Sequence, residues 1–350
     1  MKATYKKYTL DFKVPSGTSR GILTQKETWF LILRDKGRFG IGECGLLKGL
    51  SVDDVTEYEN KLAWVCQNIH LGKEELLNEL IAFPSIQFGI EQAFLSLASQ
   101  DSFELFPTAF TRMEAPIAIN GLIWMGSETF MLSQLLKKLE DGFRCIKMKI
   151  GAIDFEKELS ILRFIRDNFR PEEIELRVDA NGAFSPEKVL NKLERLAEFQ
   201  LHSIEQPIKP KQWGLMAKLC EKSPLPIALD EELIGIFSVT EKEKLLQTIK
   251  PQFIILKPSL VGGFTGSEQW ITMAKKYNIG WWVTSALESN IGLNAIAQWT
   301  YTLNTTMPQG LGTGSLYTNN MESPLEVSQG NIYYRNQKNW NQTEIEKICL

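Results

Sequence analysis

Apolar and polar positions alternate over short distances in the first part of the chain. Apolar-rich runs predict strands at residues 5–14 and 28–42, the second folded back on itself at Asp35-Lys36-Gly37. Apolar positions that recur every three to four residues then predict three helices, at about 52–69, 74–81 and 86–101. Together these elements predict an α+β domain over residues 1–110.

Residues 15–27 separate the first two predicted strands. They begin with Pro15-Ser16-Gly17-Thr18-Ser19, a polar stretch whose proline and glycine are typical of loops. Polar, glycine-containing loops beside a binding site tend to be mobile, so we expect this segment to close over bound ligand as a lid.

From Ala115 onward, short apolar runs alternate with amphipathic helical patterns, which is typical of βαβ units and a parallel sheet. Eight strands are predicted, starting near residues 115, 145, 175, 201, 226, 253, 280 and 308. Five successive runs end on a charge, at intervals of 25–30 residues that fit a strand, a helix and two loops: Lys149, Asp179, Glu205, Asp230 and Lys257. Eight parallel strands close into a barrel whose active site lies at the C-terminal strand ends, so these charges mark the expected site.

Composition and charge narrow the function classes. The chain has 350 residues and a formal net charge of −3, with 39 basic and 42 acidic residues interleaved, so neither nucleic acid nor an anionic membrane is an expected partner. No apolar stretch approaches the roughly 20 residues of a spanning helix, and the start of the chain lacks a signal-peptide core, so we expect a cytoplasmic protein. Five cysteines without a Cys-x-x-Cys pair argue against a thiolate zinc site, and two histidines argue against histidine catalysis.

Asp179, Glu205 and Asp230 end consecutive predicted strands. Neighbouring strands lie about 4.8 Å apart, so the three carboxylates are expected to converge. Three oxygen donors, with water or substrate in the remaining positions, suit Mg²⁺, a hard octahedral cation. Each acid taken alone could equally cap the helix that follows it, but three acids in succession favour a metal site.

Three lysines complete the expected site. Side chains two apart on a strand point to the same face, so Lys147 and Lys149 are expected to face the barrel interior together; a solvated strand edge is the alternative. Lys257 precedes a proline- and glycine-rich turn and is expected across the barrel from that pair. Near a metal ion and other lysines its ammonium form is disfavoured, which would make it a usable general base; a solvent-exposed lysine is the alternative.

Five short motifs carry a resemblance to a known family: Ile146-Lys147-Met148-Lys149-Ile150-Gly151, Val178-Asp179-Ala180-Asn181-Gly182, Glu205-Gln206-Pro207, Leu229-Asp230-Glu231 and Leu256-Lys257-Pro258. In this order and spacing they resemble the enolase superfamily, in its muconate lactonising enzyme subgroup, and within it the o-succinylbenzoate synthases. The resemblance implies an α/β fold in which a (β/α)7β TIM-like barrel at residues 111–319 follows a capping domain at 1–110. It also implies that a C-terminal segment, about 320–350, returns to the capping domain.

The same resemblance implies roles for the charged strand ends. The three carboxylates would bind Mg²⁺, with Mn²⁺ as a substitute, and Glu231 would lie beside this ligand set. Lys149 would be the general base, Lys147 would assist it, and Lys257 would hold the opposite face. The family reaction removes a proton α to a carboxylate, and the metal ion stabilises the resulting enediolate.

Residues 284–289 and 310–314 further resemble the last two strand ends of o-succinylbenzoate synthases, whereas the Asp-x-Asp of dipeptide epimerases near the last strand is absent. The resemblance therefore implies a carbon–oxygen lyase that dehydrates the succinyl-hydroxycyclohexadiene-carboxylate intermediate to o-succinylbenzoate in menaquinone biosynthesis. One alternative is an N-acylamino acid racemase or dipeptide epimerase that uses Lys149 and Lys257 as opposed bases, and another is a non-catalytic binding barrel. The expected partner is a small-molecule carboxylate, and the oligomeric state stays open.

Overall fold

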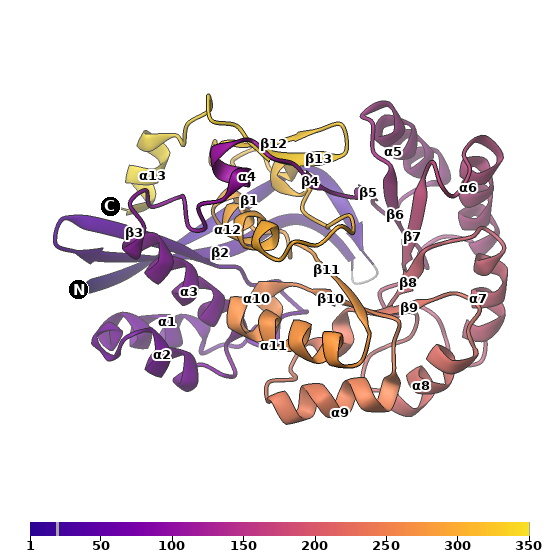
Figure 1. Cartoon of the computed structure of the whole chain (residues 1–350), viewed down its shortest axis with the longest axis horizontal. Coiled ribbons are helices and arrows are strands. Elements are labelled where there is room, and N and C mark those ends of the chain that lie inside the picture. The colour runs from indigo at the N-terminus through magenta and orange to yellow at the C-terminus, as the bar shows by residue number, and fades with distance from the viewer. Residues whose placement is uncertain (19–20, 350) are drawn as a thin grey trace.

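The protein combines an N-terminal antiparallel sheet, a curled parallel sheet and a C-terminal segment that returns to the first sheet (Figure 1). The computed structural model describes residues 1–18 and 21–349, and within them no helix is both long and apolar enough to cross a membrane. The strands are β1 (Lys2–Thr18), β2 (Gly21–Asp35), β3 (Arg38–Cys44), β4 (Ile117–Ala118), β5 (Gly121–Ile123), β6 (Cys145–Lys149), β7 (Glu175–Asp179), β8 (Ser203–Glu205), β9 (Ile227–Leu229), β10 (Phe253–Leu256), β11 (Gly280–Val283), β12 (Leu325–Ser328) and β13 (Asn331–Tyr334). The α-helices are α1 (Tyr58–Gln67), α2 (Lys73–Glu79), α3 (Pro84–Ala98), α4 (Ala109–Arg112), α5 (Glu128–Glu140), α6 (Phe155–Asn168), α7 (Val189–Ala197), α8 (Trp213–Lys222), α9 (Val239–Ile249), α10 (Pro258–Val261), α11 (Gly263–Lys276), α12 (Asn290–Thr302) and α13 (Gln342–Cys349), with short 3-10 turns at Ile69–Leu71, Glu231–Leu233 and Gly314–Leu316.

The antiparallel sheet β1-β2-β3 is covered by helices on one face and by the end of the chain on the other. Alternate residues of a strand point to opposite faces. Trp29, Leu31 and Leu33 of β2 pack with α1, α2 and α3, whereas Phe30 and Ile32 pack with α13. The alternating apolar pattern of β2 therefore builds two cores, and the second explains why the C-terminal segment returns to this sheet.

The hairpin of β1 and β2 is longer than the sequence predicts. Pairing is irregular between Asp11 and Ser16, then resumes and continues to the end of β1. Pro15 lies at the irregularity because proline has no N–H group for the ladder and is tolerated in edge strands and bulges. The prediction of a loop over residues 15–27 is therefore wrong where the structure describes the chain, while residues 19 and 20, at the centre of the expected lid, lie outside the described residues.

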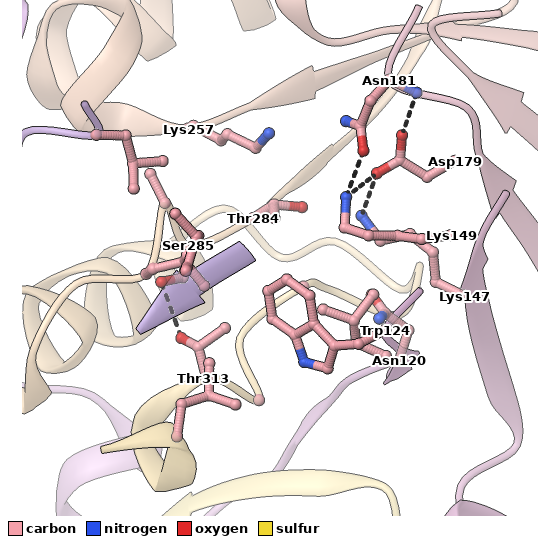
Figure 2. Close-up of a pocket in the computed structure, with 18 of the residues that line it drawn as sticks. Asn120, Trp124, Lys147, Lys149, Asp179, Asn181, Lys257, Thr284, Ser285 and Thr313 are labelled. Atoms are coloured by element: carbon pink, nitrogen blue, oxygen red, sulfur yellow. Dashed lines mark hydrogen bonds and ion pairs between the residues drawn. The ribbon is translucent and has the colours of Figure 1, made fainter. Parts of the chain in front are cut away.

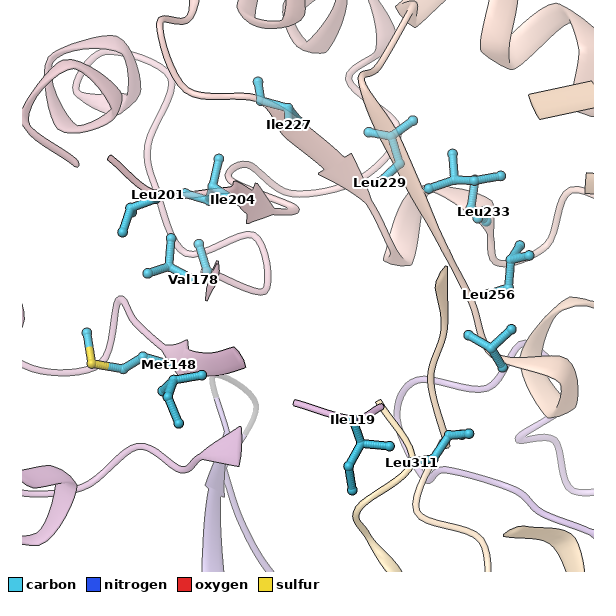
Figure 3. Close-up of a cluster of buried hydrophobic side chains, with 14 of the residues drawn as sticks. Ile119, Met148, Val178, Leu201, Ile204, Ile227, Leu229, Leu233, Leu256 and Leu311 are labelled. Atoms are coloured by element: carbon cyan, nitrogen blue, oxygen red, sulfur yellow. The ribbon is translucent and has the colours of Figure 1, made fainter. Parts of the chain in front are cut away.

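The seven parallel strands are ordered β11-β10-β9-β8-β7-β6-β5, and a helix follows each strand. Figure 3 shows apolar side chains gathered from successive strands of this sheet, among them Met148, Val178 and Ile204. These three residues each lie one position before a charged strand end. Because side chains alternate along a strand, the apolar residues pack in the core while their charged neighbours point to the other face. The predicted α/β fold with an N-terminal cap is confirmed.

Two of the predicted barrel strands differ in the structure. The first strand of the parallel sheet is β5, whereas Ile117–Ala118, within the segment predicted at 115–119, form β4. This short strand pairs with β13 in a separate small sheet of order β12-β13-β4. Residues 308–312 form isolated bridges: Gly310 donates to β11 at 2.8 Å, and Gln309 accepts at 2.9 Å from the residue before β5. Pro308 has no N–H group and glycine weakens strand pairing, so only single bridges join the two edges of the sheet here.

Two buried carboxylates tie the N-terminal sheet and its helices to the helices of the parallel sheet. Glu91 of α3 accepts hydrogen bonds from the backbone N–H groups of Phe264 (2.5 Å) and Thr265 (3.1 Å) in the first turn of α11. Glu43 of β3 accepts them from the N–H groups of Ser289 (3.0 Å) and Gly292 (2.9 Å) at the start of α12. A helix N-terminus presents free N–H groups and a positive dipole, so each carboxylate is stabilised where it lies.

Candidate active site

The five charged strand ends meet at the C-terminal edge of the parallel sheet. Lys149, Asp179 and Glu205 end β6, β7 and β8 and lie opposite one another in the register of these strands. Asp230 and Lys257 directly follow β9 and β10. All except Lys257, whose side chain is 13% exposed, are buried. Parallel pairing therefore brings the residues that the sequence singled out into one cluster.

Lysine–carboxylate pairs hold one side of this cluster together (Figure 2). Lys149 Nζ lies 2.9 Å from Asp179 Oδ2, and Lys147 Nζ lies 2.9 Å from Glu205 Oε2 and 3.9 Å from Asp179 Oδ2. Burial raises the pKa of Glu205 to about 7, although Lys147 opposes the rise. Burial also acts to raise the pKa of Asp179, but Lys149 and Lys147 outweigh it and hold that pKa well below its usual range.

Lys257 occupies the other side of the cluster. Figure 2 shows it across the pocket from Lys147 and Lys149, and its Nζ lies 2.5 Å from Asp230 Oδ2. The sequence predicted a disfavoured ammonium on Lys257 beside a metal ion, and the side chains of the chain by themselves act in the opposite direction. Burial lowers its pKa, but the carboxylates of Asp230 and Glu231 outweigh burial and raise the pKa above the usual value.

The three predicted metal ligands have suitable donor chemistry without forming a closed cage. In the part of the chain that the structure describes, no group of three Asp, Glu, His or Cys side chains is arranged to hold a metal ion. A lysine ammonium lies against each of Asp179, Glu205 and Asp230. Glu205 Oε1 is buried and has no hydrogen-bond partner, and three adjacent carboxylates are the donors that a hard divalent cation prefers. These residues therefore supply donors that fit such a cation.

Asn181 is a site residue to which sequence reasoning gave no role. Its Oδ1 accepts a hydrogen bond from Lys149 Nζ at 2.6 Å, its backbone N–H donates to Asp179 Oδ1 at 3.0 Å, and its Nδ2 donates to Glu231 Oε1 at 2.8 Å. The backbone of Asn181 is left-handed, with φ of 43°, a conformation that asparagine tolerates better than most residues. Asn181 therefore turns the chain at the end of β7 and orients the lysine beside it.

Gln206 fixes the two loops that carry the next acids. It is buried, and its Oε1 accepts hydrogen bonds from the backbone N–H groups of Asp230 (3.3 Å) and Glu232 (3.2 Å). Its Nε2 donates to Ile208 O at 3.0 Å and to Glu232 Oε2 at 3.1 Å. The side chain thus satisfies backbone groups after β8 and β9 that would otherwise be buried without partners.

A cavity of about 220 Å³ opens above the cluster, with a charged floor and an apolar roof. The strand ends of the sheet supply Lys147, Lys149, Asp179 and Lys257. The centre of the Trp124 indole ring lies 6.0 Å from Lys149 Nζ. The N-terminal part of the chain supplies the roof: Gly21, Ile22, Leu23, Leu47 and Leu50. Such a cavity suits a small molecule with a carboxylate at the floor and a flat apolar body between the two sides.

A chain of hydroxyl groups forms one wall of this cavity. Thr313 Oγ1 donates to Ser285 Oγ at 2.9 Å, and Ser285 Oγ donates to Glu288 Oε2 at 2.6 Å (Figure 2). Glu288 Oε1 accepts from Ser259 Oγ at 2.6 Å, two residues beyond Lys257. The buried Glu288 carboxylate therefore links α10 to the loop after β11, an interaction that spans too many residues to be recognised from the sequence.

Comparison with known proteins gives consistent results at the sequence and structure levels. A family described as "Enolase C-terminal domain-like" matches residues 131–337. The o-succinylbenzoate synthase of Desulfotalea psychrophila is 47% identical over 94% of this chain and 98% of its own, and the solved structure of MenC from that organism has a TM-score of 0.85 at 44% identity, over 95% of this chain and 99% of its own. The N-succinylamino acid racemase of Thermus thermophilus is 28% identical over 81% of this chain and 77% of its own.

Proposed function

The chain belongs to the enolase C-terminal domain-like family, and from that premise we propose that it is an o-succinylbenzoate synthase, a carbon–oxygen lyase of menaquinone biosynthesis. It dehydrates the succinyl-hydroxycyclohexadiene-carboxylate intermediate to o-succinylbenzoate. The observation that carries the proposal is 47% identity with a synthase of this name over 94% of the chain. The cavity is consistent with it, because its lysines lie on both sides of a space for a flat ring.

Lys149 is the general base of this reaction. Its free amine takes the proton from the ring carbon α to the carboxylate, and the electron pair of the broken C–H bond moves toward that carboxylate. The C–O bond of the hydroxyl group then breaks, the ring becomes aromatic, and Lys149 returns the proton so that the leaving group departs as water. Asp179 and Asn181, at 2.9 and 2.6 Å from Lys149 Nζ, hold the amine in position between these steps.

Asp179, Glu205 and Asp230 are the proposed ligands of Mg²⁺, with Mn²⁺ as a substitute. When bound, the divalent cation would offset the negative charge that develops on the substrate carboxylate. Lys147, whose Nζ lies 2.9 Å from Glu205 and 3.9 Å from Asp179, adds a positive charge at the same edge and so assists Lys149. Buried charges of opposite sign stabilise this arrangement only when all of them are present.

Lys257 acts by charge on the opposite face of the ring. A desolvated ammonium over a π-system is attracted by about 1 to 2 kcal/mol, and the attraction grows as the ring gains electron density. Dehydration requires no proton transfer from Lys257. Racemisation would require one, because the proton must return to the face of the substrate opposite the one it left.

The test compares dehydration with proton exchange in the metal-loaded enzyme. The cyclohexadiene substrate should be converted rapidly to o-succinylbenzoate, followed by chromatography. Either enantiomer of an N-succinylamino acid in deuterated water should take up little α-deuterium, followed by mass spectrometry. Fast deuterium uptake from both enantiomers together with slow dehydration would replace the synthase by the racemase, and inactivity towards both substrates with retained ligand binding would indicate a non-catalytic barrel.

A further inference from the structure

The substrate of the proposed function carries two carboxylates, and the metal and lysine cluster accounts for one of them. The second carboxylate ends the succinyl side chain and must also be placed in the cavity or at its mouth. A carboxylate that is removed from water and finds no cation or hydrogen-bond donor in the protein destabilises the complex by several kcal/mol. The cavity wall should therefore hold a second cationic or hydrogen-bond-donating group.

The hydroxyl wall does not supply that group. The proton of Ser285 Oγ is donated to Glu288, and its two lone pairs accept from Thr313 Oγ1 at 2.9 Å and from the Glu288 N–H at 3.3 Å. The proton of Thr313 Oγ1 is in turn donated to Ser285. A hydroxyl group has one proton and two lone pairs, so Ser285 is saturated and Thr313 can only accept. The distal carboxylate of the substrate, which only accepts hydrogen bonds, would therefore meet other hydrogen-bond acceptors at this wall.

Two cavity lysines remain for this role. In the described part of the cavity lining, Lys48 and Lys138 are the lysines without an ion pair, since the other three contact strand-end carboxylates. Lys48 is exposed, whereas Lys138 is partly buried and its Nζ lies 4.7 Å from the centre of the Phe143 ring. Burial lowers the pKa of Lys138. Its neighbour Lys137 instead lies in solvent and is paired with acids of its own helix.

Lys138 reaches the cavity from α5 because Gly121 has no side chain. A Cβ at Gly121 would lie 3.1 Å from both Cγ and Cδ of Lys138, so the aliphatic stem passes directly over this glycine of β5. The residues on either side of Gly121, Asn120 and Leu122, line the same cavity, as does Ser315. Lys138 therefore lines the cavity at the β5 edge of the sheet, and it also lines an adjoining cavity with Lys137 and Asp141.

We infer that Lys138 binds the distal carboxylate of the succinyl side chain and is a specificity-determining residue, an inference that rests on the proposed function. An ion pair in a partly desolvated site is stronger than one at the surface, because less of the attraction is lost to water. The carboxylate also gives an ion-pair partner to an ammonium that lies beside the Phe143 ring, with Asp141 and Lys137 as the charges near it. A ligand that has the same aromatic carboxylate but no distal carboxylate should gain no affinity from Lys138.

The experiment is a cycle of one substitution and one change in the ligand. Lys138→Met keeps the length of the side chain and removes its charge, and Lys137→Met is the matched control. Binding of o-succinylbenzoate and of 2-butanoylbenzoate, whose side chain ends in a methyl group, is measured by calorimetry with Mg²⁺ present. Lys138→Met should bind o-succinylbenzoate about 10- to 100-fold more weakly and 2-butanoylbenzoate as the wild type does, while Lys137→Met leaves both unchanged.

Turnover adds a readout that a structural defect would not give. Lys138→Met should raise the KM for the cyclohexadiene substrate with kcat changed only a few-fold, and Lys138→Arg should restore most of the affinity by restoring a cation. Should Lys138→Met fail to fold, Lys138→Gln compared with Lys138→Arg makes the same test. Equal binding of o-succinylbenzoate by the wild type and the uncharged variant overturns the inference, as does a loss of affinity confined to Lys48→Met. If the wild type neither binds o-succinylbenzoate nor forms it, the proposed function itself is wrong, whatever the Lys138 variants show.

Discussion

Replacing Lys149 tests the proton transfer on which the proposed function depends. Lys149→Met removes the amine, while Asp179 keeps the backbone N–H of Asn181 at 3.0 Å and Lys147 at 3.9 Å, so the end of β7 retains its main contacts. General-base catalysis contributes about 10²- to 10⁴-fold, which corresponds to roughly 3 to 5.5 kcal/mol of activation free energy. The variant should therefore lose at least two orders of magnitude in kcat. Its affinity for Mg²⁺ should stay within a few-fold of the wild type.

A second variant at the same position separates basicity from charge. Lys149→Arg keeps a cation at the end of β6, but a guanidinium does not lose its proton at neutral pH and cannot act as the base. Both variants are assayed under single-turnover conditions with the cyclohexadiene substrate, and Mg²⁺ binding is measured by calorimetry. Lys137→Met, an exposed lysine of α5 outside the cavity, controls for general effects of losing a charge.

The two variants give distinct refutations. Near-normal turnover in Lys149→Met would transfer the role of base to Lys147 or Lys257. Substantial turnover in Lys149→Arg, with little in Lys149→Met, would mean that this residue contributes only its positive charge. A loss of Mg²⁺ affinity equal to the loss of turnover would mean that Lys149 organises the metal site and would contradict its assignment as the base.

Two further predictions concern the metal ion and the pH dependence of stability. Exhaustive chelation should abolish dehydration, and Mg²⁺ or Mn²⁺ should restore it, whereas Glu205→Gln should need at least about 10-fold more Mg²⁺ for half-maximal rate; full activity after chelation would exclude the metal assignment. Burial raises the pKa of Asp53 from 3.8 to about 6, so the folded state binds the proton more tightly and stability falls as the pH rises through about 6. Asp53→Asn removes that charge and should raise stability by up to about 3 kcal/mol at pH 8 and by less at pH 5, measured by urea unfolding; equal effects at the two pH values would contradict the assignment.

Sequence reasoning located the site because its signal is local. Each of β6, β7 and β8 is a short apolar run that ends on a charge, and parallel pairing turns equal positions in sequence into neighbours in space. Lys149, Asp179 and Glu205 therefore lie side by side, as the sequence predicts. The same local reasoning identified the fold, since the alternation of strands and helices leaves few other topologies.

The elements that sequence reasoning missed depend on contacts between distant segments. Asn181 matters through its backbone turn and its hydrogen bonds to Lys149 and Glu231, which composition does not reveal. Glu288 joins Ser285 to Ser259 of α10, which lies 29 residues before it in the sequence. An eighth strand was expected near 308–312 to complete the barrel, but backbone pairing there is limited to single bridges.

Opposed lysines in one cavity suit both dehydration and racemisation, so the bases alone do not decide between the two reactions. Racemisation needs Lys149 and Lys257 to exchange protons with the same carbon from opposite faces. Dehydration needs one of them as a base and the other only as a charge, and the gain of aromaticity supplies the driving force. The group that holds the distal end selects for substrates with a terminal carboxylate, which the cyclohexadiene and an N-succinylamino acid share. A cation such as Lys138 would accept both tails, so discrimination between these two substrates must come from the fit of the ring between Trp124 and Lys257.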